Sequence, residues 1–302
     1  MNQERRNSVA SSLRAFFDEQ LFQINKLVED VIHTANSDKQ QAEQERRIVE
    51  HFVDVTNAKM RAAPDYVQRL RVGVRGLYNH VLQVASEIPP PLDFNQNSFA
   101  YDPLVNALFA SREEIDRLFD KDSEACRYMQ LNSKAEVPVM FALLLASRRE
   151  VSKLGVGRLG DMLVRDLTRQ VLNFSDHKIE APCASATELT YSTQQYLFER
   201  VVLIIRQEML ARRIEEANHR SDHSFQVRVN SLVNPECYLK VLLAYLEAPE
   251  KLLGIQKIHY RLDKMGTMLE ADVDQRTNEF DVQELRWSNM SRNIVLKIAY
   301  QR

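Results

Sequence analysis

The first part of the chain has apolar residues at the spacing of an α-helix. Between Val9 and Val31 they recur at steps of three and four, and charged residues lie between them. This spacing places the apolar side chains on one face of a helix. Burial of each large apolar side chain contributes about 1.5–3 kcal/mol, so this face is expected to pack on another element. The apolar residues are Val9, Leu13, Phe16, Phe17, Leu21, Ile24, Leu27, Val28 and Val31.

Two further helices are predicted before residue 88. Residues 36–38 interrupt the first pattern and supply the N-cap of a second helix, which runs to about Ala62. Pro64 then precedes a third helical pattern. Residues 1–87 are therefore predicted to form a long antiparallel helical hairpin. Because such a hairpin alone seldom buries its whole apolar face, we expect it to pair with a second copy of the chain or with another protein.

A run of three prolines divides the chain. Consecutive prolines favour an extended backbone, and with the polar residues that follow they predict a linker over residues 88–101. The pair Asp102-Pro103 is typical of the start of a helix. Residues 102–302 are predicted to form a helical core domain with an irregular C-terminal tail.

Within this second domain, residues 190–218 show the clearest helical pattern. Residues 136–174 are apolar on more than one face, and we assign them to buried helices broken at glycines; residues 176–186 are assigned to a loop. Near the C-terminus the apolar residues alternate with period two. Together with residues 282–287 they indicate a short β-hairpin, although a short apolar run also fits a helix. The alternating residues are Ile294, Leu296, Ile298 and Tyr300.

The glycine content agrees with a helical chain. Only 7 of the 302 residues are glycine, and tight hairpins need residues at positive φ. The sequence therefore predicts an all-α protein. It would consist of an N-terminal long helical hairpin and a larger helical core, with a short C-terminal β-hairpin as the one alternative to helix.

The charge of the chain bears on the class of its partner, and the cysteine content bears on its cellular compartment. The chain has 40 Lys and Arg against 42 Asp and Glu, so the charge does not support a nucleic-acid partner. Three widely spaced cysteines without a CxxC motif suit a reducing compartment. The longest uncharged run, residues 137–147, is far shorter than the roughly 20 residues of a membrane-spanning helix. We expect a cytoplasmic protein without a membrane anchor.

One catalogued motif is present. Residues 155–160, Gly-Val-Gly-Arg-Leu-Gly, spell GxGxxG, which in a dinucleotide-binding fold follows a strand and opens a helix. The residues before it, 148–153, are too charged for a buried strand, and Asp161 would place a carboxylate where the pyrophosphate binds. We interpret the hexapeptide as a turn between two helices and expect no cofactor.

The residues after this motif contain the candidate catalytic groups. Asp176 and His177 are adjacent in a predicted loop, where an acid and a histidine are able to exchange protons with a substrate. Asp161 and Arg165 lie close to the glycines and add polar groups to the same region. The competing interpretation is that these polar residues at a helix end act as caps and turn formers.

A second candidate is a metal site. Glu216, His219 and His223 are spaced i, i+3 and i+7, which places them on one face of a helix. Asp30 and His33 repeat the acid–histidine spacing, as carboxylate-bridged metal pairs in helical bundles require. Several arginines near His219 oppose a bound cation.

A third candidate rests on spacing alone. Arg75 and His80, and likewise Arg213 and His219, have gaps similar to those of helical ribonucleases that cleave RNA without a metal. Such gaps also arise by chance in an arginine-rich helical protein.

Long amphipathic surfaces and few catalytic signatures favour a non-enzymatic helical protein, one that acts in protein–protein interaction or regulation. The alternative is a helical enzyme. It would be either metal-dependent through His219 and His223 or ribonuclease-like through the Arg-x5-His pair.

Overall fold

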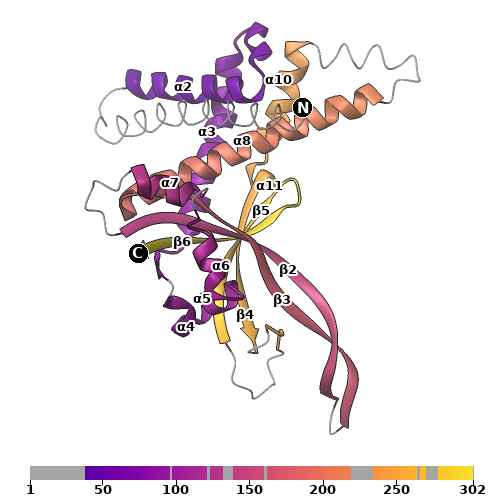
Figure 1. The fold of residues 1–302 in the computed structure, drawn as a ribbon. Coiled ribbons are helices and arrows are strands. Elements are labelled where there is room, and N and C mark those ends of the chain that lie inside the picture. The colour runs from indigo at the N-terminus through magenta and orange to yellow at the C-terminus, as the bar shows by residue number, and fades with distance from the viewer. Residues whose placement is uncertain are drawn as a thin grey trace, which may run out of the picture.

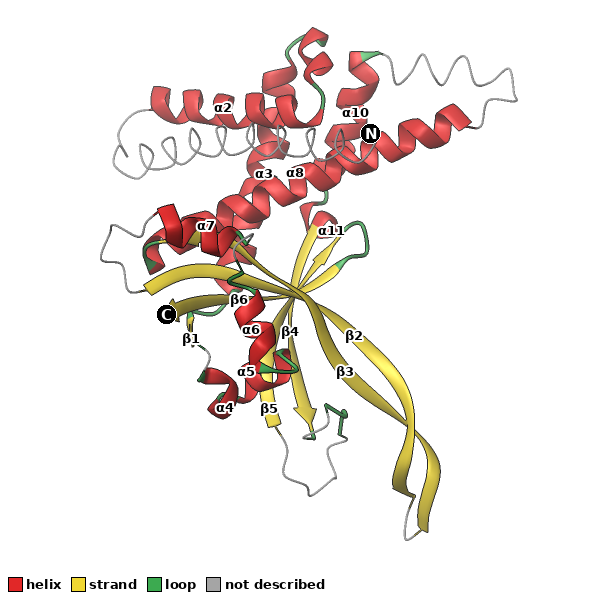
Figure 2. Ribbon diagram, in the orientation of Figure 1, coloured by secondary structure: helices red, strands yellow, loops and turns green. Residues whose placement is uncertain are grey.

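The computed structural model describes residues 38–95, 97–120, 123–131, 139–159, 162–218, 234–263, 266–269 and 278–301. Within them the chain combines helices with a large, mainly antiparallel sheet (Figures 1 and 2). The prediction of an all-α helical protein is therefore wrong. The predicted helix over residues 9–31 lies outside the described residues.

The sheet lies between two layers of helices, and each layer encloses its own apolar core. The longer helices pack on one face, and shorter ones cover the other (Figure 2). The first layer consists of α2 (Asp38–Thr56), η1 (Ala58–Ala62), α3 (Tyr66–Glu87), α8 (Ala186–Asn218), α10 (Pro235–Leu246) and α11 (Pro249–Leu252). The second consists of α4 (Ser98–Tyr101), α5 (Pro103–Leu108), α6 (Arg112–Arg117) and α7 (Glu124–Leu131).

Six strands make up the sheet, in the order β3-β2-β6-β5-β4, with β1 parallel to β6 beside β5. The remaining neighbours are antiparallel. The predicted C-terminal hairpin is present as β5 and β6, but it forms the middle of a larger sheet. The strands are β1 (Leu92–Phe94), β2 (Val139–Leu159), β3 (Met162–Cys183), β4 (Leu253–Leu262), β5 (Asn278–Trp287) and β6 (Arg292–Gln301).

The main error of the sequence analysis concerns residues 136–174, which were assigned to core helices. From Val139 onward the described part of this segment forms strands β2 and β3. Leu143 and Leu145 of β2 are buried against the long helices, and Met140 and Leu144 against the short ones. A strand that is buried on both faces loses the apolar–polar alternation by which strands are found, so its sequence resembles a buried helix.

The predicted loop over residues 176–186 is mostly strand as well, since β3 continues to Cys183. At the register shifts beside residues 141–143 and 145–147 of β2, as at the third shift beside residues 155–157, β3 has one residue more than β2. The first two shifts lie in the predicted loop. Asp176 and Ala181, with φ of 55° and 53°, lie at these shifts. The β-bulges bend β3 and increase its twist. The polar residues that suggested a loop therefore mark an irregularity within a strand.

Several helix boundaries follow the sequence signals. Asp102 caps α5, because its carboxylate accepts hydrogen bonds from the backbone N–H groups of Leu104 and Val105. The predicted long helix over residues 190–218 is confirmed as α8. Residues 88–101, predicted as a linker, contain β1 and α4, and β1 pairs with β6. The domain boundaries themselves stay a prediction.

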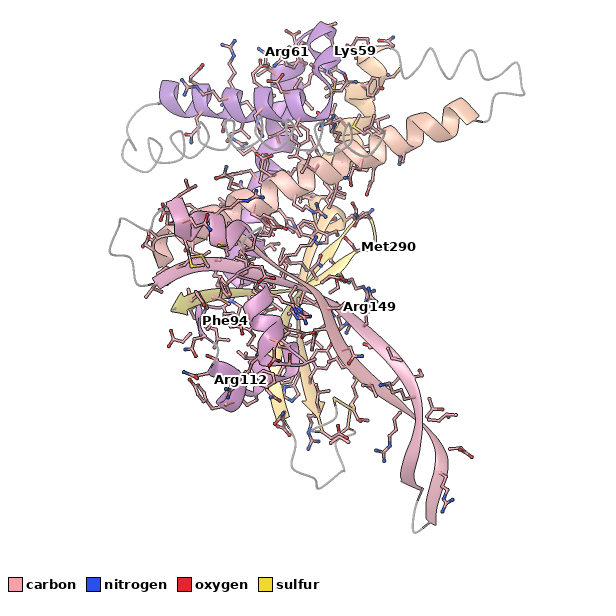
Figure 3. All side chains as sticks on the ribbon, viewed as in Figure 1. Lys59, Arg61, Phe94, Arg112, Arg149 and Met290 are labelled. Atoms are coloured by element: carbon pink, nitrogen blue, oxygen red, sulfur yellow. The ribbon has the colours of Figure 1, made fainter. Side chains whose placement is uncertain are left out.

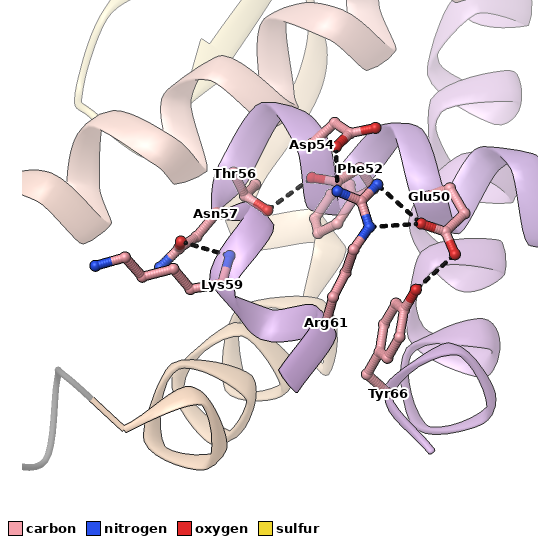
Figure 4. A network of polar contacts seen from close by, with 8 residues as sticks. All are labelled: Glu50, Phe52, Asp54, Thr56, Asn57, Lys59, Arg61 and Tyr66. Carbon is pink, nitrogen blue, oxygen red and sulfur yellow. Dashed lines mark hydrogen bonds and ion pairs between the residues drawn. The ribbon is translucent and has the colours of Figure 1, made fainter. Parts of the chain in front are cut away.

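An ion-pair network holds the joint between α2 and α3 (Figure 4). The Arg61 guanidinium contacts the carboxylates of Asp54 at 2.7 Å and Glu50 at 3.0 Å. The Tyr66 hydroxyl donates to Glu50 at 2.6 Å. The hydrogen bond to Asp54 and then that to Glu50 raise the pKa of Arg61 above its ordinary value. The second helix thus ends at Thr56, and a 3-10 turn stabilised by these charges leads into α3.

A short segment joins the two edges of the sheet. Residues 266–269 form bridges to β4 through Met268 and Leu262, and to β3 through Thr267 and Val171. The backbone N–H of Leu172 donates to the Gly266 carbonyl at 2.9 Å. The sheet therefore curls until its first and last strands meet at this segment. None of the helices among the described residues is long and apolar enough to cross a membrane.

We expect Gly266→Ala to destabilise the fold by roughly 1–2 kcal/mol, because Gly266 has φ +75° and a side chain there is strained. A Cβ atom would also lie 3.1 Å from the Leu172 carbonyl oxygen. The control is Gly76→Ala in α3, where a Cβ meets nothing within 4 Å and alanine stabilises a helix by roughly 0.5–1 kcal/mol. Urea denaturation of both variants measures the two effects. A neutral Gly266→Ala would contradict the tight junction between β3 and this segment.

Candidate functional site

The hairpin of β2 and β3 projects beyond the rest of the sheet. β2 pairs with β6 only as far as Ser147, and the segment 266–268 covers the outer edge of β3 only at residues 170–172. Residues 148–159 of β2 and 162–169 of β3, here called the arm, pair with no strand other than β2 and β3 (Figure 1). At about 3.3 Å per residue, the twelve residues of β2 reach at most about 40 Å.

A buried charge pair anchors the base of the arm. The guanidinium Nε of Arg148 lies 3.1 Å from Oε1 of Glu284 in β5. Glu284 is 0% exposed and the Arg148 side chain 17%. A second guanidinium nitrogen of Arg148 donates to the Tyr260 hydroxyl of β4 at 2.6 Å and lies 3.2 Å from Glu150. One side chain at the start of the arm thus contacts two other strands.

The energetic importance of this pair follows from the burial of Glu284. A buried carboxylate is costly unless it is compensated, and neither oxygen of Glu284 receives a hydrogen bond of good geometry from the described residues. Its ion pair with Arg148 supplies the compensation. Burial lowers the pKa of Arg148, but the Tyr260 hydroxyl and the carboxylates of Glu284 and Glu150 raise it above its ordinary value. The guanidinium therefore stays charged.

The register of the arm sorts its residues onto two faces. Arg149, Val151 and Lys153 alternate along β2 and therefore share one face, and Lys153 lies directly opposite Arg169 of β3. We call Arg149, Lys153 and Arg169 the cationic face; Figure 3 shows Arg149 where the arm leaves the sheet. The opposite face includes Arg148 and Glu150, which form an ion pair, followed by the uncharged Ser152, Leu154, Thr168 and Gln170. There Gln170 Nε2 donates to Ser152 Oγ at 3.0 Å.

The cations of this face have few internal partners. Arg149 forms an exposed ion pair of 3.4 Å with Asp176. Lys153 and Arg169 form no ion pair with the residues that the structure describes. Like charges directly across a strand pair destabilise it, so folding alone does not account for the pair of Lys153 and Arg169. Residues that break a local rule in this way are expected at functional sites.

The arm also exposes apolar surface. Leu154 is 72% exposed and Val151 39%. The exposed apolar side chains of the arm lie on a two-stranded ribbon, which by itself is only marginally stable in water. These side chains therefore do not contribute to the core of the body. We therefore take the arm, which combines exposed apolar side chains with the cationic face, as the candidate site.

The GxGxxG hexapeptide lies at the far end of the arm. Residues 155–159 end β2, and Gly160 and Asp161 lie outside the described residues. The prediction of a turn between two helices is wrong, because residues 155–159 belong to strand β2 and residues from Met162 onward to strand β3. A strand, β3, follows the motif where a dinucleotide fold would have a helix. Arg165 is exposed on this strand.

The structure gives Asp176 and His177 different surroundings. Asp176 lies on the surface beside Arg149. The His177 ring stacks on Phe109 with centroids 4.4 Å apart, and its Nε2 lies 2.8 Å from the Leu108 carbonyl oxygen. Burial lowers the pKa of His177 below its ordinary value. Its ring packs the short helices against β3, and its Nε2 is engaged with a backbone carbonyl.

The metal and ribonuclease candidates stay predictions. Glu216 lies in the last turn of α8, and His219 and His223 lie outside the described residues. No group of three or more His, Cys, Asp or Glu is placed to bind a metal within the described part of the chain. Arg75 contacts Glu45 at 3.4 Å, and His80 Nε2 lies 2.7 Å from the Leu253 carbonyl oxygen.

Residues that the sequence analysis missed make up most of this site. Arg148, Lys153 and Arg169 belong to segments that were assigned to helices. The alternation Arg149, Val151, Lys153 was the available signal, but it is too short to establish a strand without the hairpin register. No protein-family model, curated protein or solved structure matches the chain.

We expect Arg148→Ala to lower the free energy of unfolding by roughly 3 kcal/mol, because it leaves Glu284 buried without a counter-ion. The control Arg149→Ala, one residue away on the exposed face, should change it by less than about 0.5 kcal/mol. Urea denaturation compares the two. The double variant Arg148→Met with Glu284→Met should recover much of the loss. Equal effects of the two alanine variants would exclude the buried pair as the anchor of the arm.

The lowered pKa of His177 predicts a pH dependence of stability. Protonation is less favourable in the folded state, so this ring weakens the fold as the pH falls below about 6.5, the ordinary pKa of histidine. His177→Gln retains an N–H donor for the Leu108 carbonyl but does not titrate. The stability difference between wild type and variant should therefore shrink from pH 7.5 to pH 5.5 in urea titrations. A constant difference would argue against a neutral, buried His177.

Proposed function

We propose that the chain is a non-enzymatic interaction protein that docks on another macromolecule through the arm of β2 and β3. One observation carries this proposal: a ribbon fixed to the body by Arg148 exposes Val151 and Leu154 and carries two cations, Lys153 and Arg169, that form no ion pair with the described residues. Binding residues are often held on projecting segments of a rigid scaffold. The mixed α and β body would be that scaffold.

We place the protein in the cytoplasm. The three cysteines are free thiols, which supports a reducing compartment. Burial and the nearby Glu188 carboxylate raise the pKa of Cys183 to about 12, so this thiol is unreactive. The enzyme alternatives rest on sequence spacing, and no described geometry favours them. The predicted pairing through residues 1–87 also stays a prediction.

Site-specific photo-crosslinking in the source cells tests the proposal. A photoreactive amino acid at Val151 should give a discrete crosslinked adduct on irradiation, because this side chain is 39% exposed and lies on the cationic face. The same amino acid at Met290, which is 89% exposed in the turn between β5 and β6 (Figure 3), is the control and should give none. Absence of an adduct at Val151, or equal adducts at both positions, would refute the arm as the docking element.

A further inference from the structure

We infer that the arm binds double-stranded DNA through its cationic face. The inference rests on the proposed function and names the class of partner. Its starting point is the pair of Lys153 and Arg169, which lie directly opposite each other with no carboxylate partner among the described residues. Their repulsion is relieved when an anion lies between or beside them, and a chain of phosphates supplies such anions at regular intervals.

Among the side chains of the arm that the structure describes, cations outnumber large apolar residues. Among the arm side chains that the structure describes, only Val151 and Leu154 are large and apolar. Protein interfaces have a core from which charged residues are depleted and in which aromatic residues are enriched, whereas protein–DNA interfaces are polar and strongly positive. The cationic face, with the exposed Arg165 further along β3, fits the second description.

The shape of the arm fits the same partner. A two-stranded β-ribbon is narrow enough to enter the major groove of B-form DNA, and ribbons of this kind read DNA in several protein families. The reach of up to about 40 Å is similar to one helical turn of DNA. The deep, narrow major groove of duplex RNA does not admit side chains in this way.

The net charge of the chain does not oppose this binding. Residues 148–169 contain six of the 40 basic and three of the 42 acidic residues, so the remainder holds 34 basic and 39 acidic residues. Charges in solution are screened over about 10 Å at 0.1 M salt. Lys153 lies six residues, or about 20 Å, beyond the last pairing of β2 with β6 at Ser147, so screening limits the repulsion between the acidic body and a phosphate backbone at that point.

Fluorescence anisotropy with the full chain and a labelled 30-bp DNA duplex tests the inference. We expect binding at 50 mM KCl, with log K falling against log salt at a slope of about −3 for roughly three phosphate contacts. Lys153→Gln with Arg169→Gln should weaken binding at least tenfold. This double variant removes a repulsion, so it should not unfold the hairpin, and its thermal unfolding should match that of the wild type.

The matched control is Ser152→Glu with Thr168→Glu, which lowers the net charge by the same amount on the opposite face of the arm. It should change the affinity less than twofold. Equal weakening by both double variants would overturn the inference, because charge alone would then explain the effect. No binding at 50 mM KCl would also overturn it. If a protein adduct then still forms at Val151, the partner is a protein and the proposed function stands. If none forms, both the inference and the proposed function fail.

Discussion

Burial of β2 on both of its faces is the constraint on which the rest of the structure depends. Its apolar residues separate the long helices from the short ones, and each layer of helices completes a core that would otherwise be open on the sheet side. β2 also continues past the end of β6 into the arm. The same strand thus organises the core and carries the surface that is proposed to meet a partner.

The transition from core to arm occurs within a few residues and depends on charge. Up to Ala146 the even-numbered side chains of β2 are apolar and face the short helices. Arg148 continues this series, and its guanidinium compensates the buried Glu284. An uncompensated carboxylate at that position would strongly destabilise the fold. The pair therefore holds the arm at a defined point of the curled sheet, and preorganisation of this kind reduces the entropy lost on binding.

Local signals in the sequence predicted local structure well. The cap at Asp102 and the helical period of α3 and α8 depend on neighbours within a few residues, and the structure confirms them. The shared face of Ile294, Leu296 and Ile298 is confirmed as well. The fold class was wrong because β2 is covered on both faces, which removes the alternation that marks a strand. At the bulges of β3, Asp176 and Ala181 have positive φ. Residues in this conformation are also typical of loops, so the sequence predicted a loop there.

By itself the sequence determined where most of the described helices begin and end and which residues are apolar enough to be buried, because these properties depend on short-range spacing. Only the tertiary structure decided the candidate site. Arg148 and Glu284 are 136 positions apart, and Lys153 and Arg169 are brought opposite each other by the register of a hairpin. In the net charge of the whole chain, these cations are cancelled by acidic residues elsewhere. The alternation of side chains in a strand gathers the cations on one face.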